Sequence, residues 1–367
     1  MDKEQVVLKI ISSSSLYQGK YVSRVLNQGG DAWAISMPHD GGKIIPLPVG
    51  TIIELEFSHK KIPPFQAEIL ARRFKGEHSL YITAPGVISR GGRESYSHKS
   101  CRVIAFSSGK GGVGKSTLLI NTALALQNMG KKTCIIDADL GTADIDTLLN
   151  LEAAYNLYDL IEGKKKITDI IVHGPQGVLL VPGGSGLEDL ANLRDYKFSR
   201  LISAFNQLEG MADYILIDTG AGVARNVVNF LLAADEIVLV TVPEPSAILD
   251  AYALIKVLAN HQKKCLTKII VNKVEKEQEA QLAWEAVNSA SLKFLSCPVQ
   301  YLGAIPFNKL FALSTKKQEP FYMHHRDHQL SCKIKKISET LIDSPERTEE
   351  TGLSPFIHRL KRLLVGA

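Results

Sequence analysis

The sequence predicts an α/β protein: a doubly wound, mostly parallel sheet with helices on both faces, preceded by a small β-barrel-like domain. From Cys101 onward, continuous apolar runs alternate with helix-length segments, at residues 103–106, 133–136, 178–181, 214–217, 237–242 and 268–271. Runs of this kind are typical of strands in a parallel sheet that is covered on both faces. The first hundred residues instead contain short alternating segments between turn formers, which indicate antiparallel β structure. A length of 367 residues also exceeds one average domain of about 100–200 residues.

In the first domain, alternation is clearest at residues 51–57, where Ile53, Leu55 and Phe57 face one way and two glutamates the other. Similar segments occupy residues 32–37, 65–71 and 79–83, separated by Gly and Pro clusters. We therefore expect a small β domain over residues 1–95. A stretch rich in Gly, Ser and Arg at residues 85–99 predicts a linker, and residues 96–100 are assigned to the linker end between the two domains.

Composition excludes several classes of protein. With 45% apolar residues, and 43 basic against 38 acidic side chains, the chain has enough core material to fold. No run of about 18 apolar residues indicates a membrane span, and the N-terminus lacks the apolar centre of a signal peptide. The five cysteines form no CxxC pair, so neither a disulfide framework nor a zinc site is predicted and a cytoplasmic location is expected: Cys101, Cys134, Cys265, Cys297 and Cys332.

The strongest functional signal is the glycine-rich loop Gly109-Lys-Gly-Gly-Val-Gly-Lys-Ser116, which matches GxxxxGK[ST] between a predicted strand and a predicted helix. Glycines let backbone N–H groups close around phosphate oxygens, and the following helix N-terminus favours negative charge. We expect Lys115 to reach the β- and γ-phosphates and the Ser116 hydroxyl to bind Mg²⁺. The predicted phosphate-binding residues are Gly109, Lys110, Gly111, Gly112, Val113, Gly114, Lys115, Ser116 and Thr117.

The second lysine of this loop, Lys110, resembles the signature residue of the deviant Walker A motif in the MinD/ParA superfamily of dimerising P-loop ATPases, which have the SIMIBI type of fold. The resemblance implies that the cofactors are ATP and Mg²⁺ and that the ATP-bound form is a homodimer. It also implies that Lys110 reaches across the dimer to the partner's nucleotide, where its charge stabilises the transferring phosphoryl group. The alternative is that Lys110 is a solvated loop residue.

Other motifs of this superfamily follow in order. Asp137 and Asp139 end one strand and Asp218 ends another, at the edge where ligand groups gather in open α/β sheets. The resemblance implies that Asp139 positions or deprotonates the attacking water, and that Asp137 supports the Mg²⁺ and phosphate site. Asp218 would be the Walker B carboxylate, so the implied metal-site residues are Ser116, Asp137 and Asp218, and the implied catalytic residues are Lys110, Lys115 and Asp139. Taken singly, each carboxylate also suits a helix cap or a turn.

Two later segments resemble the part of the family that binds the base. Asn272, in Ile-Ile-Val-Asn-Lys, lies where the family reads adenine, and Pro306 lies in the matching Gly-Ala-Ile-Pro-Phe-Asn segment. Relatives commonly have an acidic residue two positions after this proline, whereas this chain has Asn308. The amide can still donate and accept hydrogen bonds.

The resemblance covers residues 101–345 and points to the FlhG (FleN) and MinD branch, through residues 174–186 and the segment that follows Asp218. It implies a spatial or numerical regulator of flagellar assembly, with an FlhF-like GTPase or flagellar basal-body proteins as partners. A MinD-like role in placing the cell-division site stays open, as does a ParA-like DNA-binding or adaptor role. DNA would contact the basic block at residues 309–336, which can also be a solvated helix face.

The N-terminal domain departs from that branch, because no DQAxxLR-type element precedes Cys101. Residues 49–57 and 67–73 instead resemble the small barrel that precedes PilZ in flagellar-brake proteins. The RxxxR and [DN]xSxxG signatures are missing, so we do not expect cyclic-di-GMP binding.

The C-terminal tail is divided into a linker at residues 346–354 and an amphipathic helix at residues 355–367. Ser354 suits an N-cap and Pro355 the first helical position. The apolar face comprises Phe356, Ile357, Leu360, Leu363 and Leu364, and His358 with the basic residues Arg359, Lys361 and Arg362 occupies the remainder. This pattern is typical of an interfacial membrane helix and resembles the membrane-targeting sequence of MinD and FlhG proteins. It predicts reversible, peripheral binding to the anionic inner face of the cell membrane; the alternative, compatible with it, is docking on the ATPase domain in the monomer.

Overall fold

In a computed structural model, the chain divides into two compact units, residues 1–98 and 99–367. The structure describes residues 5–11, 19–29, 32–40, 43–45, 47, 51–57, 63–73, 78–83, 101–139, 144–184, 200–201, 204–205, 207–208, 210–261, 267–343 and 351–365. The predicted linker at residues 85–99 and the first part of the predicted linker at 346–354 lie outside the described residues. Each unit is considered by itself.

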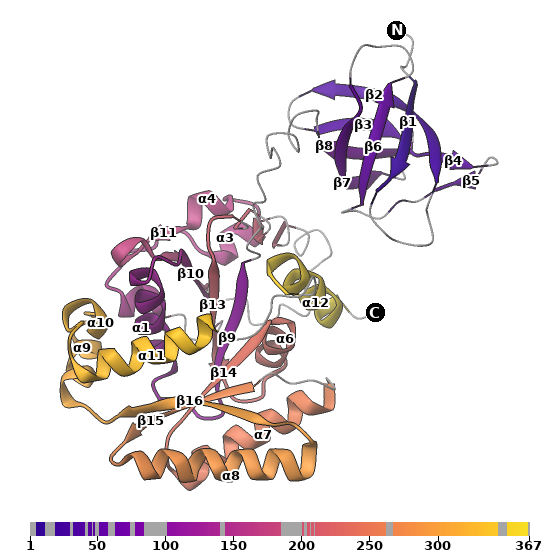
Figure 1. The fold of residues 1–367 in the computed structure, drawn as a ribbon. Coiled ribbons are helices and arrows are strands. Elements are labelled where there is room, and N and C mark those ends of the chain that lie inside the picture. The colour runs from indigo at the N-terminus through magenta and orange to yellow at the C-terminus, as the bar shows by residue number, and fades with distance from the viewer. Residues whose placement is uncertain are drawn as a thin grey trace. The chain divides into compact units, whose positions relative to one another are not determined.

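The N-terminal unit is an antiparallel sheet that curls until its first two strands meet (Figure 1). The strand order is β1-β6-β7-β8-β3-β2-β4-β5, and β1 pairs with β2 as well as with β6, which confirms the barrel-like prediction. The bounds are β1 Gln5–Ile10, β2 Lys20–Gly29, β3 Ala32–Ser36, β4 His39–Asp40, β5 Lys43–Ile44, β6 Ile52–Phe57, β7 Phe65–Arg73 and β8 Ser79–Thr83. Ile53, Leu55 and Phe57 are buried in its core, as their alternation predicts.

The second unit contains the predicted doubly wound sheet, in the order β11-β12-β10-β13-β9-β14-β15-β16. All of its pairings are parallel except that between β11 and β12 at one edge. The bounds are β9 Arg102–Ser108, β10 Thr133–Ala138, β11 Val172–His173, β12 Leu179–Val181, β13 Tyr214–Ala221, β14 Glu236–Thr241, β15 Thr267–Val274 and β16 Val299–Pro306. Residues of β9, β10 and β14 are buried throughout, which accounts for their continuous apolar sequences.

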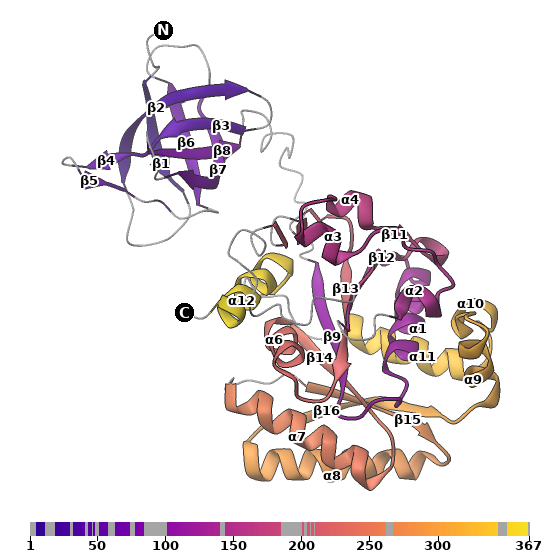
Figure 2. The same ribbon diagram turned by 180° about the vertical axis from the view of Figure 1, so that it is seen from behind.

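Helices cover both faces of this sheet, as Figures 1 and 2 show from opposite sides. One face packs against α1 Lys115–Asn128, α2 Ile145–Leu148, α9 Lys309–Lys316, α10 Phe321–His324 and α11 Gln329–Ile342. The other packs against α3 Leu157–Ile161, α4 Ile167–Ile170, α6 Arg225–Ala233, α7 Pro245–His261, part of α8 Glu277–Leu295, and α12 Leu353–Val365. The two layers leave the carboxyl ends of the parallel strands as the edge where a ligand site forms.

The C-terminal helix α12 confirms the predicted amphipathic pattern and lies against α6 (Figures 1 and 2). It begins at Leu353, two residues before the predicted start at Pro355. The Gly352 N–H donates to the Asp235 carboxylate, and the Gly352 carbonyl accepts from Phe356 N at 3.0 Å, so the first turn of the helix forms directly after Gly352. The prediction that Ser354 is the N-cap is therefore wrong. No helix among the described residues has both the length and the apolar character needed to cross a bilayer.

Candidate nucleotide-binding site

A cavity of about 680 Å³ lies at the carboxyl edge of the sheet, beside the loop that joins β9 to α1. Its size is in the range of small-molecule and cofactor sites. Seven of the predicted residues line it: Gly111, Gly112, Gly114, Lys115, Ser116, Thr117 and Asp139. The other described lining residues are Ser108, Ala138, Asp144, Leu148, Gly220, Ala221, Ala224, Asn226, Val227 and Thr315.

The shape of the loop requires glycine at two positions. A Cβ at Gly109 would lie 2.4 Å from the backbone carbon of Asp250, so only glycine allows the loop to approach α7. Gly114 has a φ of 94° and would place a Cβ 2.4 Å from the Asn272 amide nitrogen. That amide donates to the Val113 carbonyl at 2.7 Å, and the Lys273 ammonium donates to the Gly112 carbonyl at 2.7 Å. The end of β15 therefore holds the loop in place.

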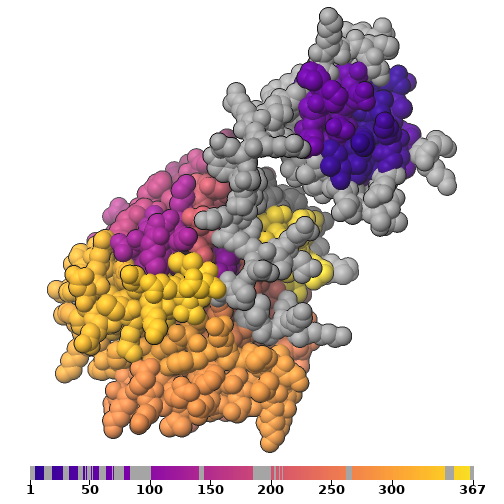
Figure 3. Space-filling model, in the orientation of Figure 1, coloured from indigo at the N-terminus to yellow at the C-terminus, as the bar shows by residue number. Residues whose placement is uncertain are grey.

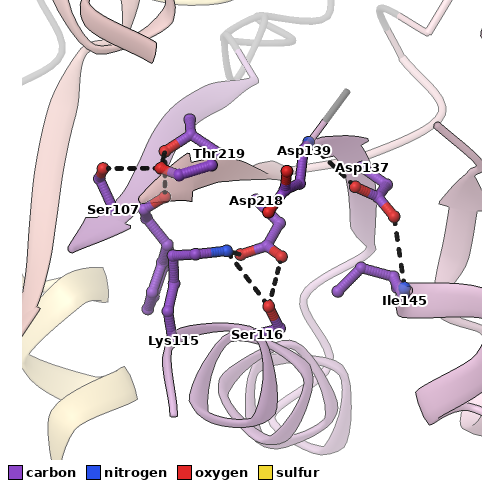
Figure 4. A network of polar contacts seen from close by, with 10 residues as sticks. Ser107, Lys115, Ser116, Asp137, Asp139, Ile145, Asp218 and Thr219 are labelled. Carbon is purple, nitrogen blue, oxygen red and sulfur yellow. Dashed lines mark hydrogen bonds and ion pairs between the residues drawn. The ribbon is translucent and has the colours of Figure 1, made fainter. Parts of the chain in front are cut away.

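The polar centre of the site consists of the buried Lys115 and Asp218 and the half-buried Ser116 (Figure 4). The Lys115 ammonium donates to Asp218 Oδ1 at 2.6 Å, and the Ser116 hydroxyl donates to Oδ2 of the same carboxylate at 2.6 Å. Burial raises the pKa of Asp218, while the adjacent Lys115 charge and hydrogen bond lower it. A hydroxyl and a carboxylate oxygen in contact beside a phosphate-sized loop are the donor types that Mg²⁺ takes together with substrate phosphates. The residues present thus fit the ATP and Mg²⁺ that the sequence predicts.

Asp137 is not among the described residues that line the cavity, and its carboxylate instead accepts bonds from two backbone N–H groups. Its Oδ1 accepts from Asp139 N at 3.1 Å and its Oδ2 from Ile145 N at 3.3 Å (Figure 4). Burial, followed by repulsion from Asp218, raises the pKa of Asp137 to about 7. Asp139 itself lines the cavity, close enough to β13 that a Cβ at Gly220 would lie 3.4 Å from its Oδ1.

Lys110 precedes the lining residue Gly111 but is not among the described residues that line the cavity, and its partner is on the loop before α7. Its ammonium donates to Glu244 Oε2 at 2.7 Å and to the Ser246 hydroxyl at 3.3 Å. Both members of the ion pair are largely exposed, with side chains 42% and 59% accessible. The hydrogen bond and the charge of Lys110 lower the pKa of Glu244. Lys110 is therefore held within its own subunit, by a contact that is solvated and easily exchanged.

The predicted base-side residues are not among the described residues that line the cavity. Asn272 is buried, and both ends of its amide are engaged, with the Val113 carbonyl and with Lys273 N at 2.9 Å. Pro306 ends β16 next to Val274. Asn308 caps α9, because its Oδ1 accepts from Leu310 N and Phe311 N at 2.8 and 3.0 Å.

The sequence interpretation missed three parts of the site. Asp144 lines the cavity, and its pKa is raised by burial and then by Asp218. Its presence in the same acidic stretch as Asp137 and Asp139 was the available signal. Glu244 gave none, because its contact with Lys110 joins positions 134 apart. The first turn of α6, with Asn226 and Val227, also faces the cavity, since α6 follows the β13 carboxyl end.

The loop, its lysine and its serine–aspartate contact define the second unit as a P-loop nucleoside-triphosphate-binding protein. A family model for ParA, described as NUBPL iron-transfer P-loop NTPase, matches residues 99–342, and the chain belongs to this ParA/MinD family. A second model, described as Flagellar protein YcgR, matches residues 6–85.

Two curated proteins are similar over the ATPase unit. The antiactivator FleN of Pseudomonas aeruginosa is 35% identical over 260 residues, covering 71% of this chain and 93% of FleN. The flagellum site-determining protein YlxH of Helicobacter pylori is 33% identical over 271 residues, covering 72% of this chain and 90% of YlxH.

Solved structures give the same fold. The Aquifex aeolicus MinC:MinD cell division complex contains a chain that matches with a TM-score of 0.55 and 28% identity, covering 69% of this chain and 100% of that one. MinD of Pyrococcus horikoshii, complexed with Mg-ADP, matches with a TM-score of 0.55 and 26% identity, covering 66% and 96%.

Proposed function

We propose that this protein is an ATP-hydrolysing molecular switch that dimerises with ATP, binds the inner face of the cell membrane and regulates the number or position of flagella. One observation carries the flagellar role: two separate segments are each similar to flagellar proteins. Residues 6–85 match the YcgR model, and the ATPase unit is similar to FleN and YlxH. The structure of the nucleotide site and of α12 supports the switch.

The reaction is ATP plus water to ADP plus phosphate. Bound Mg²⁺ would neutralise phosphate charge, and Ser116 and Asp218 would be its protein ligands. Lys115 lies beside both residues, so its ammonium is placed to bind phosphate oxygens once Asp218 turns toward the metal. Asp139 and Asp144 are the two carboxylates among the described residues that line the cavity, and we assign the attacking water to Asp139.

Dimerisation would complete the site. Lys110 pairs with an exposed glutamate, so breaking its contact with Glu244 costs little free energy in this solvated position. In the ATP-bound dimer, the Lys110 ammonium would instead contact the partner's nucleotide. A positive charge supplied across an interface ties hydrolysis to the dimeric state.

The tail helix has two mutually exclusive uses for its apolar face. In this structure Leu353, Phe356, Ile357 and Leu360 are buried in the core of the ATPase unit, and the Phe356 ring stacks on Phe230 with centroids 6.5 Å apart. A membrane would need the same side chains. The docked helix is therefore the form that does not bind lipid, and release is required for membrane residence.

The helix α6 connects the nucleotide site to this docking surface. It begins directly after the loop that follows β13, and Asn226 and Val227 of its first turn line the cavity. Its nine residues span about 14 Å, and positions 227–233 are all buried, with α12 packed alongside. A shift of the β13–α6 loop on binding the γ-phosphate would move the surface that α12 occupies.

Membrane affinity would depend on two tails acting together. The three basic residues of the tail contribute about 1 kcal/mol each near an anionic leaflet, or about 3 kcal/mol. A single helix of this kind binds reversibly, whereas two helices on one dimer gain from effective concentration. ATP would thus control membrane residence through dimerisation.

Two other roles are carried as alternatives. Similarity to MinD structures favours placement of the cell-division site, which a deletion strain would reveal through misplaced septa. Nucleotide-dependent DNA binding would use α9 to α11, the orange-to-yellow face in Figure 3. There Lys333 pairs with Glu277 at 2.9 Å, while Lys316, Lys317 and Lys336 are exposed. Salt-dependent retention on DNA with ATP would support that role.

Two experiments test the proposal. By sedimentation velocity, Asp139→Ala should accumulate an ATP-bound dimer and Lys115→Ala should remain monomeric; equal dimerisation of the two variants would refute the assigned roles. In cells, deletion of the gene should change the number or position of flagella, counted by electron microscopy, without misplacing septa. An FlhF-like GTPase and basal-body proteins are the partners to test by co-purification with the ATP-bound dimer.

A further inference from the structure

Asp235 joins three segments at the strand edge opposite the nucleotide cavity. It lies between α6 and β14, and its side chain is only 2% exposed. Its Oδ2 accepts from Val103 N of β9 at 2.9 Å, and both carboxylate oxygens lie 3.0–3.1 Å from Gly352 N, at the start of α12. The remaining partner is Arg359 of α12, whose Nη2 donates to Oδ1 at 2.7 Å.

Arg359 also fixes the helix by a second bond. Its Nε donates to the carbonyl of Ala233, the last residue of α6, at 2.7 Å. Terminal helix carbonyls lack partners within their own helix, so this contact satisfies a group that docking would otherwise bury. Arg359 thus faces the protein, with its side chain 22% exposed, whereas Lys361 and Arg362 on the same helix are exposed.

The same guanidinium is one of the three cations that would contact an anionic membrane. Carboxylates and lipid phosphates both suit the fork of N–H donors on arginine, and in the docked helix the Nε and Nη2 donors of Arg359 are already bonded to Ala233 and Asp235. Removing the helix would also leave Asp235 with only the Val103 N–H among the partners named above. Docking and lipid binding therefore compete for one side chain.

We propose that Asp235 is a latch for the tail helix, which anionic lipid headgroups must outcompete for Arg359. This proposal rests on the membrane role proposed above and names the residue that sets how much anionic lipid is needed to release the helix. Asp235 would hold the tail docked in the nucleotide-free protein and confine release to surfaces rich in anionic lipid. The exposed cations Lys361 and Arg362 would attract the helix to an anionic surface without breaking the contact between Asp235 and Arg359.

Asp235→Asn is the direct test, because the amide oxygen can still accept from Val103 N while the charge that holds Arg359 is lost. In the nucleotide-free full-length protein, we expect amide hydrogen exchange across residues 353–365 to rise on the order of tenfold or more. Nucleotide-free binding to phosphatidylglycerol vesicles should rise by a similar factor, whereas binding to phosphatidylcholine vesicles should not. Glu285→Gln, an exposed position on α8, is the control for the change in net charge and should leave both readouts unchanged.

A second variant keeps the test valid if Asp235→Asn fails to fold. Arg359→Lys keeps the positive charge for lipid but cannot make both bonds, so it should also raise exchange and vesicle binding, and the double variant should be less than additive. Unchanged exchange in Asp235→Asn and Arg359→Lys would overturn the latch. If exchange is unchanged in both variants while the wild type binds vesicles with ATP and not without it, the latch is wrong and the membrane role stands. If exchange rises in the variants but their binding to nucleotide-free vesicles does not, competition by lipid is wrong.

Discussion

The buried pair formed by Lys115 and Asp218 gives a quantitative prediction for the nucleotide-free protein. Lys115→Ala would leave the Asp218 carboxylate, which is wholly buried, without its cation. Removing one partner of a buried ion pair costs about 3–5 kcal/mol, because the other charge stays desolvated. At about 2–4 °C per kcal/mol for a unit of this size, the unfolding midpoint of the ATPase unit should fall by about 6–20 °C.

The assay is thermal unfolding followed by calorimetry, with no nucleotide present. Lys110→Ala is the matched control from the same loop; its pair with Glu244 is largely exposed, so its loss should cost at most about 1 kcal/mol. Adding Asp218→Asn to Lys115→Ala should restore part of the loss, because a neutral amide needs no counter-charge. Equal midpoints for the two lysine variants would refute the argument. The result also matters for interpretation, since failure of Lys115→Ala to bind ATP is informative only below its unfolding midpoint.

Three further predictions concern the loop, catalysis and the tail. Gly109→Ala should weaken binding of a fluorescent ATP analogue at least about tenfold, because its Cβ would meet the Asp250 backbone; unchanged affinity would contradict the assigned packing. Lys110→Ala should retain ATP binding but lose about 10³-fold in phosphate release, as expected for a charge supplied in trans; normal turnover would exclude that role. Phe356→Ala should speed hydrogen exchange in α12 about a hundredfold or more, since truncating a core phenylalanine costs about 3–5 kcal/mol. Leu282→Ala, at a side chain 66% exposed, should not, and protection retained in Phe356→Ala would contradict the docked state.

The parallel sheet could be predicted because its strands are buried on both faces, so their sequences are continuous apolar runs. β2 was missed because its alternation is interrupted by Ser23, which is buried and satisfied by donating to the Ser36 carbonyl at 2.6 Å. A buried serine of this kind looks like a turn residue in the sequence. Only the fold shows that its hydroxyl has a partner on the neighbouring strand.

For the site, the motifs indicated which residues act but not which partners they have. The P-loop motif indicated Lys115, and strand endings indicated Asp218, but their contact across 103 positions follows from the pairing of β9 with β13. The amphipathic helix of the tail could also be predicted, because its apolar spacing and its charges belong to neighbouring residues in the sequence. Where its apolar face lies depends on α6 and Asp235, which local sequence does not reveal.

Co-sedimentation with phosphatidylglycerol vesicles tests the central claim most directly. The full chain and a chain lacking residues 355–367 are compared with ATP and with ADP, using Asp139→Ala to slow turnover. The proposed switch predicts that the full chain binds strongly with ATP and weakly with ADP, and that the shortened chain binds in neither state. Equal binding of the full chain in both nucleotides, or ATP-dependent binding that survives the deletion, would contradict it.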